Sequence, residues 1–217
     1  IAKYSDTPVV ITPINVSQVI EHIGKPVIRT KVGSPYVVKA MEENGATFGF
    51  EANGGGISKD VMLSRDAGSV TIKILNILNK EGKTLKALIG TFPQFYLCRT
   101  KIECPMEIYS TILEDIKKGF DISDNGSNIG TSVRIEDIDG LKIWKDNNSW
   151  TLFRPSSNAP EFRVFAEATT EEDALKLCEE GMGIVSRIRD SIIQRGQVTI
   201  TTTVVATKDD NILIKNS

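Results

Sequence analysis

Short apolar runs alternate with helix-like patterns over the first part of the chain. The runs are bounded by Gly, Pro and Asn, which is typical of buried strands, and apolar residues spaced three or four apart are typical of amphipathic helices. In order, the pattern predicts a strand at 8–12, a helix at 16–23, a strand at 26–30, a helix at 36–43, a strand at 46–50 and a helix at 66–79. This order favours an α/β sandwich, a mixed sheet with helices on both faces.

Residues at the helix ends support these three helices. Asn15 or Ser17 opens the first helix, and Ser34-Pro35 supplies the second with a cap and a first-turn proline. The third helix ends at Glu81-Gly82. Its apolar positions are Ile72, Leu75, Ile77 and Leu78.

The pattern changes near residues 91–93, and strands become the main element. It predicts a strand at 95–102, a helix at 107–118, strands at 131–135, 141–145, 149–153 and 162–167, and a long helix at about 173–194. We therefore expect an α+β domain, an antiparallel sheet packed on two helices. The boundary should fall within 83–93, giving domains at 1–88 and 89–217, with a Thr- and Val-rich tail from Gln197 that could add a strand or hairpin.

Composition restricts the partners that the chain can have. Its formal net charge of -2 gives no broad basic surface for nucleic acid, and no apolar run approaches the length that spans a bilayer. Three cysteines are too few and too irregular for a disulfide framework or a zinc site, and the Asp residues are spread out rather than gathered as a metal cage. We expect a cytoplasmic protein that binds a small molecule, neither nucleic acid nor a membrane, and holds no metal in this chain.

The run Arg154-Pro155-Ser156-Ser157-Asn158-Ala159-Pro160 joins two strand-like segments and carries groups that suit a phosphate. The guanidinium of Arg154 offers a fork of donors, and Ser156, Ser157 and Asn158 allow successive backbone N–H groups to point at one anion. The alternative is an ordinary hairpin connection whose arginine pairs with a carboxylate, because Pro, Ser and Asn are common turn residues.

Two loops of the first domain add further candidate groups. Glu51, Asn53 and Gly54 follow a strand in a glycine-rich run, where a carboxylate and an amide suit sugar hydroxyls and glycine lets the backbone approach a ligand. The alternative there is a flexible glycine turn. A second loop joins a strand to a helix N-terminus that could receive an anion. Its candidate residues are Lys31, Gly33 and Ser34.

Taken in order, three segments resemble the α-D-phosphohexomutase family, which contains phosphoglucomutases, phosphomannomutases and phosphoglucosamine mutases. The segments are Arg29-Thr30-Lys31-Val32-Gly33 with Tyr36-Val37, Phe48-Gly49-Phe50-Glu51-Ala52-Asn53-Gly54-Gly55, and the Arg154 run followed by Arg163-Val164 and Glu167-Ala168. The resemblance reaches to about Gly196 and covers the third and fourth of the family's four domains.

The resemblance implies a role for each loop. The family's third-domain loop holds sugar hydroxyls and matches Glu51 and Asn53, while its fourth-domain loop binds the phosphate that is not being transferred and matches Arg154, Ser156, Ser157 and Asn158. Three positions depart from the usual pattern. Asn158 stands where the family usually has Thr, Phe50 stands where Gly is common, and Ser34 stands where some members have His or Asp.

The resemblance also implies a reaction that this chain cannot complete alone. Such enzymes interconvert hexose 1-phosphate and hexose 6-phosphate through a phosphoserine in the first domain, a hexose bisphosphate intermediate that also serves as activator, and Mg²⁺ held by the second domain. Neither the Ser-His-Asn-Pro type of serine loop nor the Asp-Gly-Asp-x-Asp-Arg type of metal loop occurs in the sequence. The expected partners are a hexose phosphate and domains one and two of the same enzyme, and the alternative is a non-catalytic two-domain protein that binds sugar phosphates.

Overall fold

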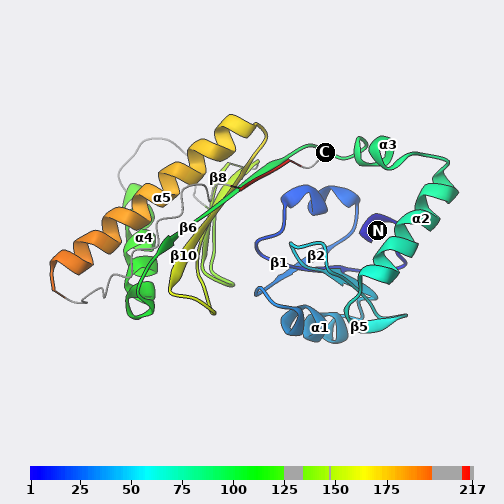
Figure 1. Cartoon of the computed structure of the whole chain (residues 1–217), viewed down its shortest axis with the longest axis horizontal. Helices are drawn as coiled ribbons and strands as arrows, with labels where there is room; N and C mark the ends of the chain where they lie inside the picture. The colour runs from blue at the N-terminus through cyan, green and yellow to red at the C-terminus, as the bar shows by residue number, and fades with distance from the viewer. Residues whose placement is uncertain (125–133, 147, 197–211, 216–217) are drawn as a thin grey trace. The chain divides into compact units, whose positions relative to one another are not determined.

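A computed structural model of the chain describes residues 1–124, 134–146, 148–196 and 212–215 (Figure 1). Two compact units divide between Phe95 and Tyr96. The division suggested by the sequence, after residue 88, falls within the short helix α3 (Leu85–Ile89) of the first unit. That helix buries Leu88, which is 8% exposed, and such a short apolar segment resembles a linker when it is judged by sequence alone.

The first unit is a mixed five-stranded sheet with helices, as the pattern predicts. Its elements are η1 (Ala2–Tyr4), β1 (Val10–Pro13), η2 (Gln18–Ile23), β2 (Val27–Thr30), α1 (Ser34–Glu43), β3 (Phe48–Phe50), β4 (Gly56–Ser58), β5 (Met62–Arg65), α2 (Ala67–Glu81) and α3. The strand order is β2-β1-β3-β4-β5. β1 runs parallel to β2 and β3, and the last two strands are antiparallel additions.

Side chains of β1 alternate between two apolar layers. Ile11 packs with Val37 and Met41 of α1, which covers one face of the sheet (Figure 1). Val10 points to the other face, where it packs with Ile20 of the 3₁₀ helix η2. Because β1 is buried on both faces, it reads as a continuous apolar run in the sequence.

Several elements of the first unit differ from the prediction. The helix predicted at 16–23 is the 3₁₀ helix η2, and the Ser17 Oγ accepts a hydrogen bond from the Val19 N–H at 3.2 Å. The N-cap of α1 is Gly33, so Ser34 lies in the first turn rather than at the cap. The pattern did not predict β4, β5 or α3, since the strands are short, the first begins in a glycine run, and the second is exposed throughout.

Helix α2 buries less of its apolar surface than the sequence suggested. Ile72 and Leu75 are 61% and 58% exposed, whereas the predicted positions Ile77 and Leu78 are partly buried. Asp66 caps the helix by accepting hydrogen bonds from two backbone N–H groups.

The second unit is an antiparallel sheet with two long helices. Its elements are β6 (Tyr96–Glu103), η3 (Met106–Ile108), α4 (Tyr109–Asp124), β7 (Arg134–Glu136), β8 (Leu141–Asp146), β9 (Ser149–Pro155), β10 (Glu161–Ala168), α5 (Glu171–Gln194) and β11 (Ile212–Lys215). The strand order is β11-β6-β10-β9-β8-β7. The predicted strand at 131–135 has its first three residues outside the described part, and of the tail from Gln197 the described residues 212–215 form β11 beside β6.

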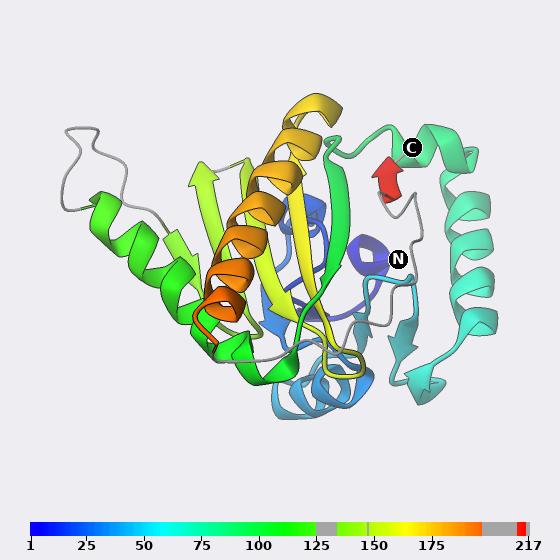
Figure 2. The ribbon, with the colours of Figure 1, turned by 60° about the vertical axis from the view of Figure 1, so that its left-hand side comes forward.

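Both long helices of the second unit cover the same face of the sheet (Figure 2). Phe153 of β9 belongs to this core, together with residues of α4 and α5. Since neighbouring residues of a strand point to opposite faces, Arg154 points to the face that the helices leave uncovered. Trp144 and Trp150 form a cross-strand pair, with ring centroids 6.4 Å apart.

Candidate functional site

Two candidate loops of the first unit lie at one edge of its sheet. β1, β2 and β3 are parallel, so their carboxyl ends share an edge. The segment with Lys31, Gly33 and Ser34 follows β2, and the segment with Glu51 and Asn53 follows β3. The fold therefore brings together the two segments that the sequence singled out in this domain.

The segment at 51–55, which we call the Glu51 loop, forms the tip of the β3–β4 hairpin. The Glu51 N–H donates to the Gly55 carbonyl at 3.1 Å, and the Gly54 N–H donates to the Glu51 carbonyl at 3.0 Å. Gly54 has a φ of 80°, a left-handed conformation that glycine adopts without steric cost. The loop is thus a compact turn, held by its own short-range hydrogen bonds.

The side chain of Asn53 takes part in this turn. Its Oδ1 accepts a hydrogen bond from the Gly55 N–H at 3.0 Å. The side-chain NH₂ then remains as the group of Asn53 that can donate to a ligand. The sequence pattern predicts that this residue binds a sugar hydroxyl. In the structure its Oδ1 is used by the turn, and its NH₂ group is left to make that contact.

Glu51 is buried, at 8% exposure, and forms an ion pair that the sequence did not predict. Its Oε2 lies 3.2 Å from the Nε of Arg65 on β5, and the contact is an ion pair without hydrogen-bond geometry. Gly55 makes room for this arginine, because a Cβ at that position would lie 2.6 Å from the Arg65 Cδ. Arg65 lies near Glu51 because β5 runs back antiparallel to β4. The local sequence around either residue therefore does not indicate the ion pair.

The loop after β2 offers fewer free groups than its composition suggested. The guanidinium of Arg29 donates to the carbonyls of Pro13 and Val16 at 3.0 and 2.9 Å and pairs with Glu21 at 2.6 Å. Arg29 is therefore a structural residue that ties β2 to the segment before η2. Lys31 is exposed, and its role remains a prediction.

An apolar cavity of about 400 Å³ lies in the first unit beside the Glu51 loop. Gly54 belongs to its lining, but Phe48, Phe50 and Ile74 are typical of the rest. Such walls offer few hydrogen-bonding partners for hydroxyls or phosphate. The candidate sugar site is consequently the loop itself and not this cavity.

In the second unit, the segment at 154–160, which we call the Arg154 loop, joins β9 to β10. Arg154 and Pro155 belong to β9, and the register pairs Arg154 with Arg163. The Ser156 N–H donates to the Glu161 carbonyl at 2.9 Å, and the Asn158 N–H donates to the Ser156 Oγ at 3.3 Å. Two of the backbone N–H groups expected to face an anion are thus already engaged within the loop.

The side chains of the Arg154 loop divide into buried and exposed groups. Ser156 is 2% exposed and supports the turn, while Ser157 and Asn158 are exposed and share a hydrogen bond of 3.1 Å between Oγ and Oδ1. A ligand at this loop would meet the hydroxyl of Ser157 and the amide of Asn158 rather than a row of backbone N–H groups.

The backbone of the Arg154 loop is held from outside. The Tyr109 hydroxyl, at the start of α4, donates toward the carbonyls of Ala159 and Glu161 at 3.1 and 3.0 Å. The Cys104 N–H donates to the Pro160 carbonyl at 2.9 Å. These anchors come from about fifty residues earlier in the chain, so the sequence pattern around the loop could not reveal them.

The side chain of Arg154 is almost fully buried, with 7% of its area exposed, and its Nε donates to Asp139 Oδ2 at 2.8 Å. The carboxylate pairing that the sequence left open as an alternative therefore exists. It uses only the Nε, however, and the terminal guanidinium nitrogens make no hydrogen bond within the described part of the chain. Those nitrogens are the groups that can bind an anion.

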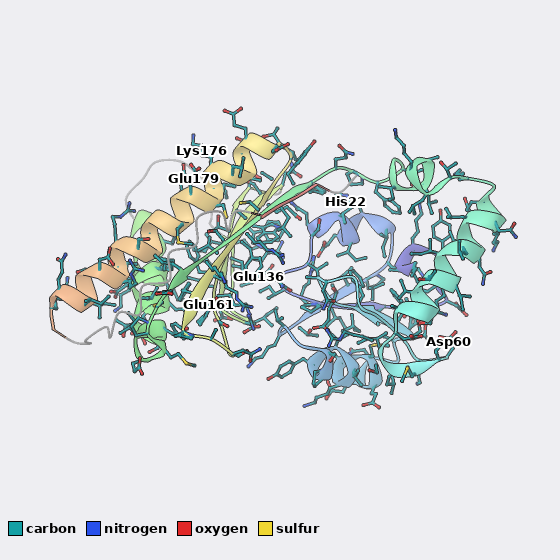
Figure 3. All side chains as sticks on the ribbon, in the orientation of Figure 1. His22, Asp60, Glu136, Glu161, Lys176 and Glu179 are labelled. Atoms are coloured by element: carbon teal, nitrogen blue, oxygen red, sulfur yellow. The ribbon has the colours of Figure 1, made fainter. Side chains whose placement is uncertain are left out.

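A second charged group lies where β10 begins. Glu161, labelled in Figure 3, accepts hydrogen bonds from the Arg163 Nε and Nη2 at 2.9 and 2.6 Å and pairs with Lys101 at 3.2 Å. Burial alone would raise the pKa of Glu161, but these two cations outweigh that effect and hold the pKa below its usual value. Arg163 is therefore committed to Glu161 and differs from Arg154 in having a partner for its terminal nitrogen.

Neither a metal site nor a membrane helix appears among the residues that the structure describes. No group of three or more His, Cys, Asp or Glu side chains there is placed to hold a metal ion. Within the same ranges, no helix is long and apolar enough to cross a bilayer.

Comparison with known proteins supplies the family. Residues 4–96 match the family described as phosphoglucomutase/phosphomannomutase, alpha/beta/alpha domain III. This chain belongs to the α-D-phosphohexomutase family, because curated members that are 30% and 34% identical to it match 82% and 81% of its length. The resemblance carried by the three sequence segments is thereby confirmed, and the first unit of this phosphohexomutase chain corresponds to the third domain.

Curated phosphohexomutases match across both units. The phosphoglucomutase/phosphomannomutase of Thermococcus kodakarensis is 34% identical over 183 residues, which are 81% of this chain and 37% of the relative. The probable phosphoglucosamine mutase of Methanopyrus kandleri is 30% identical over 182 residues, which are 82% of this chain and 37% of the relative. The chain thus spans well under half the length of these relatives.

Solved phosphohexomutase structures share the fold. A phosphoglucomutase/phosphomannomutase family protein from Burkholderia thailandensis matches with a TM-score of 0.63 at 16% identity, over 84% of this chain and 38% of the other. The N-acetylphosphoglucosamine mutase of Aspergillus fumigatus, solved in complex with GlcNAc-6P and magnesium, matches with a TM-score of 0.59 at 15% identity, over 86% and 40% of the two chains. The predicted fold class, an α/β sandwich followed by an α+β domain, is confirmed.

Proposed function

We propose that this chain is the sugar- and phosphate-binding part of a phosphohexomutase that interconverts hexose 1-phosphate and hexose 6-phosphate. The observation that carries the proposal is the state of Arg154, a buried guanidinium whose Nε is bound by Asp139 and whose terminal nitrogens have no protein partner in the described ranges. A guanidinium that is held by its Nε while its terminal donors stay available can form paired, charge-assisted hydrogen bonds with phosphate oxygens, so an arginine in this state suits an anionic ligand. The two curated relatives, a probable phosphoglucosamine mutase and a phosphoglucomutase/phosphomannomutase, support the same choice.

In this proposal the two loops perform different tasks. The guanidinium of Arg154, with the Ser157 hydroxyl and the Asn158 amide, binds the phosphate that is not being transferred. The Glu51 carboxylate accepts hydrogen bonds from sugar hydroxyls, and the Asn53 NH₂ donates to one. Hydroxyl groups can be bound equally in either orientation of the sugar, as a reaction with a reorienting bisphosphate requires.

Such binding contributes to catalysis because phosphoryl transfer depends on positioning and charge neutralisation. Binding energy from the idle phosphate and the hydroxyls orients the other end of the sugar toward the reacting groups. We place the phosphoserine and the Mg²⁺ site in the part of the full-length protein that this chain does not include. No described residues form a metal cage, so no step of the reaction is assigned to a metal in this chain.

Calorimetric titration of the chain with glucose 1-phosphate and with glucose tests the binding role. We expect weak binding of the sugar phosphate, and Arg154→Gln should weaken it at least tenfold because charge-assisted hydrogen bonds to phosphate are lost. Arg189→Gln is the matched control, since Arg189 is also partly buried and ion-paired but lies on α5. Equal affinity for glucose and its phosphate would sink the proposal.

The enzymatic part of the proposal needs the full-length protein. Mutase activity should be measured with glucose 1-phosphate, mannose 1-phosphate and glucosamine 1-phosphate side by side, with and without Mg²⁺ and a hexose bisphosphate activator. Activity on any of the three supports a phosphohexomutase and identifies its preferred sugar. Tight sugar-phosphate binding without turnover of any of them would favour the non-catalytic binding protein.

A further inference from the structure

We propose that Asp139 is a positioning residue that holds the guanidinium of Arg154 in the orientation that receives phosphate. The inference rests on the proposed phosphate role of Arg154 and extends it to a residue outside the Arg154 loop. Its basis is the 2.8 Å hydrogen bond from the Arg154 Nε to the Asp139 Oδ2, between side chains that are 7% and 22% exposed.

Asp139 is itself held firmly by the turn that precedes β8. Gly140 has a φ of 85°, and a Cβ there would lie 2.2 Å from the Phe153 carbonyl oxygen and 3.0 Å from the Arg154 Cα. Leu141, the next residue, pairs with Phe153 in the ladder between β8 and β9. The turn thus lies directly beside Arg154 of β9, and only glycine fits at this close approach.

Binding through the Nε has a specific consequence for the guanidinium. A planar guanidinium that is held by its Nε–H keeps its two terminal nitrogens together on the opposite side, as a fork for a phosphate. Fixing this side chain before the ligand arrives reduces the conformational entropy that is lost on binding. Asp139 therefore orients Arg154 and does not itself touch the phosphate.

The electrostatic effect of Asp139 has the opposite sign. A carboxylate close to an anion site repels phosphate, so removal of its charge alone should raise the affinity. Loss of the hydrogen bond should lower the affinity. The two effects can be separated by comparing Asp139→Ala, which removes both charge and acceptor, with Asp139→Asn, which keeps an acceptor oxygen and removes the charge.

The test is calorimetric titration of these variants with glucose 1-phosphate and with inorganic phosphate. We expect Asp139→Ala to lose about tenfold in affinity for both ligands despite the removal of a negative charge. Asp139→Asn should stay within about twofold of the unsubstituted chain or bind more tightly. Asp137→Ala is the matched control, since Asp137 lies in the same turn, is 77% exposed and contacts Lys117 instead.

Each outcome decides between the alternatives. If Asp139→Ala binds as tightly as the unsubstituted chain, or if Asp139→Asn loses as much affinity as Asp139→Ala, the positioning role is wrong. If Arg154→Gln keeps full affinity, the proposed function itself is wrong. This variant therefore distinguishes failure of the phosphate-binding role of Arg154 from failure of the positioning role of Asp139. Emission of Trp144 and Trp150 reports whether a variant is folded, and Asp139→Ser replaces Asp139→Ala if the latter does not fold.

Discussion

The two candidate loops both connect antiparallel strands, but they are held in different ways. The Glu51 loop is a turn whose backbone and Asn53 side chain bond within five residues of one another. The Arg154 loop has internal bonds too, yet its backbone and its arginine are fixed by residues from α4, from the position just after β6 and from the turn before β8. The first loop is therefore mainly a local structure, and the second is a product of the folded unit around it.

This difference also separates the charged partners of the two loops. Glu51 pairs with Arg65, whose side chain is half exposed, at a distance without hydrogen-bond geometry. Arg154 pairs with Asp139 in a short, largely buried hydrogen bond. Ion pairs in water contribute little to stability, whereas buried hydrogen-bonded pairs are costly to break. We expect substitutions around the Arg154 loop to have the larger effects.

The largest expected effect comes from two turn glycines, one in the Glu51 loop and one in the turn before β8 that packs against Arg154. Gly54 and Gly140 have nearly the same φ, 80° and 85°, but a Cβ on Gly54 meets nothing within 4 Å, while one on Gly140 meets backbone atoms. Gly140→Ala should lower the free energy of unfolding of the second unit by about 2–5 kcal/mol, through backbone strain and overpacking. Gly54→Ala should cost its own unit about 1–2 kcal/mol, through backbone strain alone.

Separate probes can follow the two units in this experiment. Both tryptophans of the chain, Trp144 and Trp150, lie in the second unit, so their emission in urea reports that unit. Hydrogen exchange of peptides from the first unit reports the effect of Gly54→Ala. If Gly54→Ala and Gly140→Ala lower the free energy of unfolding equally, the close contact between Gly140 and β9 does not add to the cost of substitution.

The next effect concerns the hydroxyl that anchors the Arg154 loop. Tyr109→Phe removes the donor shared by the Ala159 and Glu161 carbonyls but keeps the ring packed against Phe162. We expect the free energy of unfolding of the second unit to fall by about 1–2 kcal/mol, which tryptophan emission in urea would measure. Tyr36→Phe is the control, because Tyr36 is 50% exposed. A change no larger than that of the control would mean that the loop does not depend on Tyr109.

The smallest effect is a pH dependence at the start of β10. The pKa of Glu161 is lowered in the folded chain, since Arg163 and Lys101 outweigh the effect of burial. Its stabilising contribution is therefore complete above the usual pKa of glutamate and is lost as the pH falls through the lower folded value. In the Glu161→Gln variant, the free energy of unfolding of the second unit should fall less on acidification, by a difference of under about 1 kcal/mol.

Urea unfolding at several pH values measures this contribution. Glu103→Gln is the matched control, because Glu103 is the residue opposite Glu161 in the register of β6 and β10. Identical pH profiles for Glu161→Gln and the unsubstituted chain would show that the cluster with Arg163 and Lys101 is not coupled to folding.

The sequence predicted strands and long helices well where burial left a pattern. β1 is buried on both faces and β3 largely so, and α5 begins after a Thr170 that caps it through the Asp173 N–H. β5 was missed because all four of its residues are exposed, so neither alternation nor an apolar run marks it. The short helix α3 was missed because five residues are too few for a helical period to show.

The candidate loops were predicted from their chemistry, and their supporting residues were not. Arg154, Ser157 and Asn158 stand together in the sequence, as do Glu51 and Asn53. The backbone N–H groups of the Arg154 loop were expected to face an anion, but two of them satisfy the loop itself, because a tight turn must bond its own polar groups. The donors left for a ligand are the terminal nitrogens of Arg154 and the side-chain NH₂ of Asn158, since the Ser157 hydroxyl donates to the Asn158 Oδ1.

By itself, the sequence determined the fold class, the family and the two loops, because each depends on residues that are close together or on a regular pattern of burial. Only the tertiary structure decided that Arg65 contacts Glu51, that Tyr109 holds the Arg154 loop and that Asp139 binds the Arg154 Nε. Hairpins, turns and helices place these partners next to the loops. Such contacts produce no periodic pattern in the sequence, so the sequence does not predict them. The physical reason is that a charge or a hydroxyl is paired by its position in space, and in the second unit that position is set by the whole sheet.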